Sequence, residues 1–299
     1  MRVIIAGKGK MLANLIRGAL LSKAEVVGIL RYENLYMSAF QLYLHDLLNN
    51  SPELTLIKKY KLKDIKCSSI NSDKFKNEIL NLNADVLLVG TWGEKVNNDV
   101  INLPVIGTIN VHPSLLPKYR GPNPYLQTIW HREKYSGVTF HLMTDKYDAG
   151  GILAQDKIEI LPVDTGKELR EKTVFRARLL CARLFEKLNN GCVEPIAQNE
   201  SEASYYKDIK PEDMTLNLAN ETAEEVLAHV RAFYPFRPVY IQSDNKFFIV
   251  NPYKAELLDD YDVPASIKSS AKSSLTVACK DGRCVKFSDL KKYNKFVLF

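Results

Sequence analysis

The chain has 299 residues, of which 46% are hydrophobic and 25% charged, and its net charge is +6 at neutral pH. This is the composition of a soluble globular protein that is long enough for two domains. No run of about 18 uncharged apolar residues occurs, and the first apolar run is too short for a signal peptide, so we expect a cytoplasmic protein without a membrane span.

The first half of the chain alternates between strand and helix patterns. A short apolar strand is predicted at residues 3–6, a helix at 11–21 and a second strand at 25–30. Two further apolar runs, at 84–89 and 105–111, predict two more strands. Because buried strands of a parallel sheet read as unbroken apolar runs, we predict a doubly wound, Rossmann-like α/β domain with a mainly parallel sheet.

The following segments complete this first domain. The patterns predict a helix at 122–133, strands at 138–143 and 152–160, and a long helix that Asp164 caps and that ends near residue 188. We therefore assign residues 1–189 to the first domain. Residues 190–206 are polar, contain glycine and proline, and suit a linker.

The pattern changes to short strands in the last part of the chain. A helix at 222–233 ends before Pro235, and the strand-like runs after it lie at 239–242, 247–250 and 275–287. The last run contains Lys280-Asp281-Gly282, a hairpin signal. We predict that residues 207–299 form a small β-barrel-like (OB-like) domain.

The cysteines point to neither a disulfide framework nor a metal site. Their number is odd and no Cys-x-x-Cys pair occurs among them; they are Cys67, Cys181, Cys192, Cys279 and Cys284. We expect reduced thiols and no metal.

The end of the strand at 105–111 carries the most informative polar residues. Asn110 and His112 point to the same side because side chains alternate along a strand, and Pro113 then ends the ladder. Open α/β sheets place their sites at this carboxyl end. An amide N–H and an imidazolium could together stabilise an oxyanion on a carbonyl carbon.

A carboxylate is expected beside this pair. Asp148 is the best candidate, because Ala149-Gly150-Gly151 lets the backbone bend close to a reacting centre. Its charge would raise the pKa of the imidazole, and it could accept a proton from the nucleophile. His141, on the predicted strand at 138–143, is a further candidate for contact with a substrate.

These residues form a recognisable motif. Residues 110–121 read Asn-x-His-Pro-Ser-Leu-Leu-Pro-x-Tyr-x-Gly, and a Tyr-Asp-x-Gly-Gly loop follows at 147–151. This pattern resembles the folate-dependent formyltransferase family, over about residues 1–190. The resemblance implies transfer of a formyl group from 10-formyltetrahydrofolate to an amine, with Asn110, His112 and Asp148 as the catalytic residues. It also implies a folate pocket lined by two segments, Ser114, Leu115, Leu116 and Pro117, and Gly90, Thr91 and Trp92.

Two branches of that family fit the two-domain layout. Methionyl-tRNA formyltransferases act in translation initiation, and other members formylate nucleotide-linked amino sugars. Residues 230–236 resemble the start of the tRNA branch's C-terminal domain, and residues 118–121 resemble its motif loop. Residues 268–299 include eight basic and two acidic residues, an excess of positive charge that suits binding of a nucleic-acid backbone. The sequence therefore favours initiator methionyl-tRNA as the acceptor.

Two departures favour the amino-sugar branch instead. The motif loop continues Gly121-Pro122-Asn123-Pro124 where the tRNA branch has Gly-Ala-Ala-Pro. Residues 31–50 contain one Lys or Arg, where the tRNA branch carries a basic insertion. A nucleotide-linked amino sugar is thus the alternative acceptor, and the oligomeric state stays open.

Gly7-x-Gly9 raises a competing hypothesis from another class. It could belong to a dinucleotide-binding turn, but Leu12 stands at the third glycine position and Arg31 ends the second strand in place of an acid. We predict a tight turn here, with an NAD(P)-dependent oxidoreductase as the lesser alternative.

Overall fold

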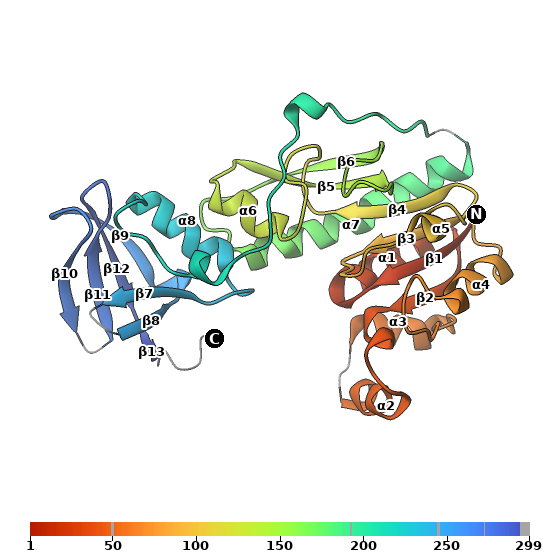
Figure 1. Cartoon of the computed structure of the whole chain (residues 1–299), viewed down its shortest axis with the longest axis horizontal. Helices are drawn as coiled ribbons and strands as arrows, with labels where there is room; N and C mark the ends of the chain where they lie inside the picture. Colours follow the sequence, from red (N-terminus) through yellow and green to blue (C-terminus); the bar gives the residue numbers. More distant parts are fainter. Residues whose placement is uncertain (49–50, 192, 244–245, 272, 294–299) are drawn as a thin grey trace. The chain divides into compact units, whose positions relative to one another are not determined.

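The computed structural model of the chain describes residues 1–48, 51–191, 193–243, 246–271 and 273–293 (Figure 1). Cys192, Lys272 and Lys295, which entered the sequence predictions, lie outside the described residues. The chain divides into two compact units. The first comprises residues 1–120, 137–158 and 172–205, and the second comprises 121–136, 159–171 and 206–299.

A six-stranded sheet with the order β2-β1-β3-β4-β5-β6 forms the centre of the first unit. Its strands are β1 (Arg2–Gly7), β2 (Glu25–Arg31), β3 (Val86–Gly90), β4 (Gly107–His112), β5 (Tyr135–Leu142) and β6 (Ile152–Glu159). The first four are parallel, and β5 is antiparallel to β4. The predicted mainly parallel sheet is confirmed. The strand predicted to start at Val105 starts at Gly107, because Val105 is 89% exposed and lies outside the ladder.

Helices cover both faces of this sheet (Figure 1). α1 (Gly9–Leu21) and α7 (Gly166–Asn189) pack on one face in an apolar cluster, and α4 (Asp73–Asn81) and α5 (Asn98–Ile101) pack on the other. The predicted cap Asp164 is wrong by one position. The helix starts at Gly166, where Thr165 bonds Glu168, while the Asp164 carboxylate accepts from the Leu161 N–H.

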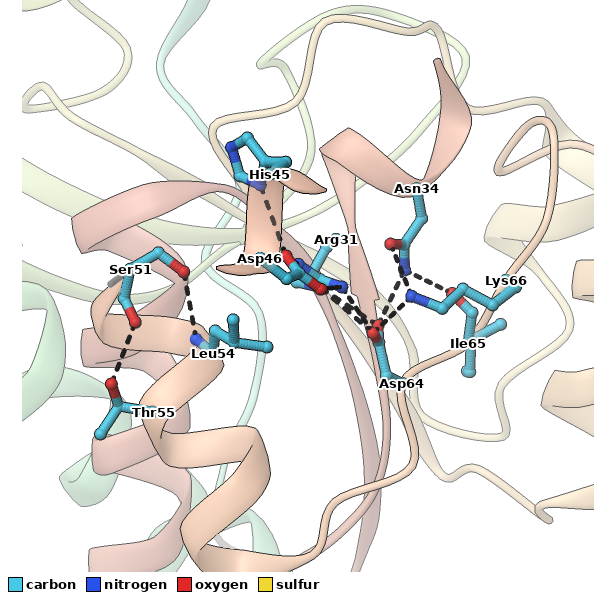
Figure 2. Close-up of polar contacts among 10 residues, drawn as sticks. All are labelled: Arg31, Asn34, His45, Asp46, Ser51, Leu54, Thr55, Asp64, Ile65 and Lys66. Carbon is cyan, nitrogen blue, oxygen red and sulfur yellow. Dashed lines mark hydrogen bonds and ion pairs between the residues drawn. The ribbon is translucent and has the colours of Figure 1, made fainter. Parts of the chain in front are cut away.

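A buried charge network occupies the end of β2 (Figure 2). The Arg31 guanidinium is only 1% exposed and lies 2.7 Å from both Asp46 and Asp64. Asn34 and Lys66 also donate to the Asp64 carboxylate. Burial alone would lower the pKa of Arg31, but the two carboxylates outweigh it and hold the pKa above its ordinary value. A buried charge needs such partners. Arg31 is therefore fully engaged by protein groups where a dinucleotide-binding fold would carry an acid.

The segment around this network is helical. It contains η1 (Tyr32–Leu35), α2 (Ala39–Leu48) and α3 (Pro52–Tyr60). Asp46 belongs to α2, and its contact with Arg31 ties that helix to the sheet. The lysines between residues 58 and 66 are exposed.

Antiparallel strands make up most of the second unit. One sheet has the order β10-β11-β12-β9 and the other β13-β8-β7. Their strands are β7 (Val239–Ser243), β8 (Lys246–Val250), β9 (Ala255–Tyr261), β10 (Ser266–Ala271), β11 (Ser274–Ala278), β12 (Arg283–Ser288) and β13 (Lys291–Tyr293). The predicted hairpin joins β11 to β12, and Gly282 adopts the left-handed φ of +77° that its turn requires.

Helices and short turns complete this unit. They are α6 (Pro124–Trp130), α8 (Ala223–Phe233), η3 (Pro211–Met214) and η4 (Pro252–Lys254). α8 begins with a capping box in which Thr222 and Glu225 satisfy each other's backbone N–H groups. Across the described part of the chain, no helix is long and apolar enough to cross a membrane.

The described cysteines are free thiols. Cys67, Cys181, Cys279 and Cys284 are buried and unbridged. Burial raises the pKa of Cys181 and of Cys279, the latter to about 12, so neither is a reactive thiolate at neutral pH.

Candidate active site

The three side chains predicted to act together meet around one carboxylate oxygen. Asp148 Oδ1 lies 3.4 Å from Asn110 Nδ2 and 3.4 Å from His112 Nδ1. His112 is 4% exposed and Asn110 is half-buried. An amide donor, an imidazole and a carboxylate thus converge at the carboxyl end of β4.

Strand register brings these groups together. Asn110 pairs with Val89 on one side and with His141 of the antiparallel strand β5 on the other. His112 pairs with Thr139. Because paired residues of an antiparallel ladder point to the same face, Asn110 and His141 are cross-strand neighbours.

The loop that carries Asp148 is held in an unusual conformation. Asp148 has a left-handed φ of +54°, and a Cβ on Gly150 would lie 1.9 Å from the Leu142 carbonyl oxygen. Only glycine fits at position 150. The side-chain amide of Gln198 donates to the carbonyl oxygens of both Asp148 and Gly150, each at 2.8 Å. These contacts fix the loop at the carboxylate.

Gln198 is itself fixed by an arginine of the motif loop. Arg120 Nη2 donates to Gln198 Oε1 at 2.8 Å and forms an ion pair with Glu200 at 2.7 Å, in the short turn η2 (Glu200–Glu202). Gln198 and Glu200 lie in the segment predicted to be a linker. Sequence reasoning missed both, because polar residues in an aperiodic segment give no signal of long-range contacts.

The protonation of His112 differs from the sequence prediction. Its Nε2 faces the Tyr119 carbonyl oxygen at 2.8 Å, so Nε2 carries the hydrogen and Nδ1 faces Asp148. Burial lowers the pKa of His112 below its ordinary value, although the charge of Asp148 and the Tyr119 carbonyl act in the opposite direction. The predicted effect of the carboxylate is present, but the larger effect of burial leaves the pKa of the ring below its ordinary value. Nδ1 is the position that can take up a proton beside the carboxylate.

This direction of the shift predicts how His112 titrates. The ring should stay uncharged at neutral pH and take up a proton only below its ordinary pKa of about 6.5. Asp148→Asn removes the charge that favours the imidazolium and should lower the pKa further. NMR titration of the ring in both proteins measures these two pKa values, and a pKa above about 6.5 in the unaltered protein would refute the prediction.

The same shift predicts how stability depends on pH. Because the unfolded chain binds the proton on His112 more readily than the folded one, the free energy of unfolding should fall as the pH drops below about 6.5.

His141 adds a second imidazole to the cluster. It is 1% exposed, its Nδ1 lies 2.8 Å from the Leu142 carbonyl oxygen, and its Nε2 lies 3.2 Å from Asn110 Nδ2. The distance from Nε2 to Asp148 Oδ1 is 3.7 Å. The side-chain alternation along β5 had marked this residue as a candidate.

In the first predicted folate-binding segment, residues 114–117, several polar groups form hydrogen bonds within the protein. The Ser114 hydroxyl donates to the Lys118 carbonyl oxygen at 2.7 Å, and Ser114 and Leu116 are buried. Thr139 and Gln155 bond the backbone of this segment, the former at Ser114 and the latter at Leu116. Leu115 and Pro117 are partly exposed, and these are the side chains of the segment that a ligand could reach.

The second predicted segment follows β3. Gly90 pairs with Val111 of β4, and Thr91 is exposed with a φ of +59°. The rings of Trp92 and Tyr32 pack edge to face, with their centroids 5.0 Å apart. The buried indole N–H of Trp92 makes no hydrogen bond within the described residues.

Sequence families and relatives agree with this geometry. The formyl transferase family matches residues 1–182, and the C-terminal domain of formyl transferases matches residues 208–297. A methionyl-tRNA formyltransferase of Pediococcus pentosaceus is 31% identical over 83% of this chain and 77% of its own length. The corresponding protein of Thermotoga maritima is 32% identical over 63% of this chain, a match that spans 59% of the relative.

Solved structures share the fold over the whole chain. An N-formyltransferase from Helicobacter canadensis, in complex with folinic acid and dTDP-3-aminofucose, has a TM-score of 0.73 at 20% identity and covers 97% of this chain and 99% of its own. The sugar 3N-formyltransferase WlaRD, studied with dTDP and 5-N-formyl-THF, has a TM-score of 0.71 at 19% identity, with 99% of each chain covered. Matches to both parts of the family, over most of the chain, lead to one conclusion: this chain belongs to the formyl transferase family.

Proposed function

We propose that this protein transfers the formyl group of 10-formyltetrahydrofolate to a primary amine. The observation that carries the proposal is the convergence of Asn110, His112 and Asp148, with both nitrogen atoms 3.4 Å from the same carboxylate oxygen. Acyl transfer needs a donor for the developing oxyanion and a base for the proton of the nucleophile, and these side chains supply both.

The reaction follows from the position of each atom. The amine attacks the formyl carbon, and the Asn110 N–H stabilises the negative charge on the formyl oxygen. The proton that leaves the amine passes to His112 Nδ1, where Asp148 stabilises the imidazolium. Collapse of the tetrahedral intermediate breaks the bond from the formyl carbon to N10 of the folate, and N10 receives that proton. The products are an N-formyl amine and tetrahydrofolate.

The donor binds, in this proposal, along the carboxyl ends of β3 and β4. The two segments there are those predicted from the family resemblance, around Trp92 and around Leu115. The unpaired indole N–H of Trp92 supports this placement. A buried donor without a partner costs free energy, and a hydrogen bond to an acceptor of the ligand would offset that cost.

The charge of the second domain favours a small acceptor. Residues 208–299 contain thirteen Lys and Arg and thirteen Asp and Glu residues, so the net charge of this segment is zero. Two of the basic residues between 268 and 299 have acidic neighbours in space: Lys268 forms an ion pair with Asp260 at 2.6 Å, and Lys286 is paired in the ladder with Glu256. A surface that binds a nucleic-acid backbone carries an excess of positive charge.

We therefore infer a nucleotide-linked amino sugar as the acceptor. The full-length likeness to the nucleotide-sugar enzymes supports this inference through the fold, and the scarcity of basic residues between 31 and 50 agrees with it. Initiator methionyl-tRNA is the second candidate. It is favoured by the 31% identity to a methionyl-tRNA formyltransferase and by the segment 230–236.

A charge-reversal experiment separates the two acceptors. Lys291 and Lys292 are exposed on β13 and carry the basic charge at the end of the described chain. With an amino-sugar acceptor, Lys291→Glu with Lys292→Glu should change kcat/KM less than about twofold, since this proposal places the acceptor phosphates beside the catalytic loop of the first unit. With tRNA, each lost phosphate contact should weaken binding, and affinity should drop about a thousandfold or more from about 50 to about 200 mM salt.

The assay follows label from 10-formyltetrahydrofolate into dTDP- and UDP-linked amino sugars and, separately, into initiator methionyl-tRNA. Lys58→Glu with Lys59→Glu, the same charge change on an exposed face of α3, is the matched control. Label in tRNA alone, with a loss specific to the β13 variant, would overturn the amino-sugar inference.

A further inference from the structure

We propose that His141 is a positioning residue, which holds the Asn110 amide so that one of its N–H bonds points at the formyl oxygen. This inference rests on the proposed catalytic role of Asn110. It concerns a histidine outside the three residues that the family motif supplies.

The contacts of the ring determine which nitrogen carries the hydrogen. His141 Nδ1 lies 2.8 Å from the Leu142 carbonyl oxygen, which can only accept, so Nδ1 donates. Nε2 lies 3.2 Å from Asn110 Nδ2, which can only donate, so Nε2 accepts. A hydrogen on Nε2 would bring two donors face to face. The uncharged ring with its hydrogen on Nδ1 satisfies both contacts.

The orientation of the Asn110 amide is determined independently. Its Nδ2 also lies 3.4 Å from Asp148 Oδ1, and a carboxylate oxygen can only accept. The nitrogen of the amide, and not its oxygen, must therefore face both His141 and Asp148. One of the two hydrogens on Nδ2 is directed at His141, and the other points toward Asp148.

The second hydrogen is the one available for catalysis. The 3.4 Å contact with Asp148 is at the long end for an N–H···O bond, so the formyl oxygen can replace the carboxylate as its acceptor. The shorter contact with His141 stays in place while this happens. Without it, the half-buried amide could rotate about χ2, and a preorganised donor would become a mobile one.

The position of His141 is well determined by its surroundings. It is 1% exposed on β5, and its ladder partner across the strands is Asn110 itself. The His112 ring lies at 6.5 Å, centroid to centroid, and the His141 contacts do not use it. The ring therefore acts on Asn110 more directly than on the proton-accepting imidazole.

Two variants separate positioning from packing. His141→Leu keeps a buried side chain of similar size but removes the acceptor, and kcat should fall about 10- to 100-fold with the folate KM within about twofold. His141→Gln places an acceptor oxygen near the position of Nε2, and kcat should stay within about fivefold of the unaltered enzyme. His131→Leu, the same change at an exposed histidine, is the control and should leave kcat unchanged.

A double-mutant cycle with Asn110→Ala is decisive. If His141 acts through the amide, adding His141→Leu to Asn110→Ala should alter kcat less than about twofold. If His141→Leu lowered kcat equally in the unaltered enzyme and in Asn110→Ala, the proposal would be overturned. It would also be overturned if the His141→Leu enzyme kept more than half of normal kcat, or if the His141→Gln enzyme were as slow as His141→Leu.

The tautomer can be measured without any assay of activity. NMR of the protein labelled with ¹⁵N-histidine should place the hydrogen of His141 on Nδ1, with the signal assigned by its loss in His141→Gln. A hydrogen on Nε2 would overturn the proposed contact whether or not the protein transfers formyl groups. Absence of formyl transfer in the unaltered enzyme, with the hydrogen on Nδ1, would instead refute the proposed function.

Discussion

Replacement of Asn110 by alanine is expected to lower kcat by about 100-fold or more and to leave the folate KM nearly unchanged. The amide N–H meets charge that exists on the formyl oxygen only in the transition state, so its loss raises the barrier without weakening the ground-state complex. Single-turnover kinetics with 10-formyltetrahydrofolate measure the effect on the chemical step.

A control variant and two further measurements make this result specific to Asn110. Asn14→Ala removes an exposed amide that donates to the Lys10 carbonyl oxygen in α1, and it should leave kcat unchanged. The folate KM reports on the donor complex, and circular dichroism reports on the fold. A folded Asn110→Ala enzyme with more than about a third of normal kcat would refute the role of this residue as the oxyanion donor.

Asp148→Asn is expected to be as damaging as His112→Ala, with a loss of about 100-fold or more in kcat. The asparagine keeps the shape of the side chain, but it neither stabilises an imidazolium at Nδ1 nor takes up a proton. The polar contacts that hold the loop remain, because Gln198 bonds the backbone of Asp148 and Gly150 and not the carboxylate.

The two residues should behave as a unit. A variant carrying both Asp148→Asn and His112→Ala is expected to be little slower than either single variant, since each change removes the same proton-accepting site. Pre-steady-state rates for the four enzymes complete the cycle. Losses that multiply would mean that the carboxylate and the imidazole act in separate steps.

The parts of the fold that sequence predicted best are those in which one local pattern decides the structure. The apolar run before Gly7 and the helical spacing after it predicted β1 and α1, and the Asp281-Gly282 pair predicted the hairpin of β11 and β12. Strand ends were less certain. Val105 is apolar, but it is exposed in the turn before β4.

No helix was predicted at α2, although Phe40, Tyr43, Leu44 and Leu47 have helical spacing. What the sequence could not show is which face of this helix is covered. These four residues and Leu48 are exposed, whereas Leu42 is buried and Asp46 contacts Arg31. β9 and β10 were also missed, since acidic or small polar residues dominate both strands. Neither periodicity nor composition reveals a pairing partner that is distant in the chain.

The site was predicted to the extent that it is local. Asn110 and His112 lie two residues apart on one strand, and Asp148 was found through the glycines beside it. The contact from Gln198 to the Asp148 loop spans 50 residues, and it left no trace in the sequence. The protonation of His112 could not be predicted from the sequence either. The sequence showed the carboxylate that raises the pKa of the ring, but not the burial that lowers it by more.

Transfer of the formyl carbon itself is the most direct test of the proposed chemistry. The enzyme is mixed with 10-formyltetrahydrofolate labelled with ¹³C in the formyl group and with a dTDP-linked amino sugar, and the products are followed by NMR. The label is expected in a new N-formyl amide, formed in equal amount with tetrahydrofolate, and the Asn110→Ala enzyme is expected to form it about 100-fold more slowly. Release of labelled formate in place of the amide, or equal rates for the two enzymes, would contradict it.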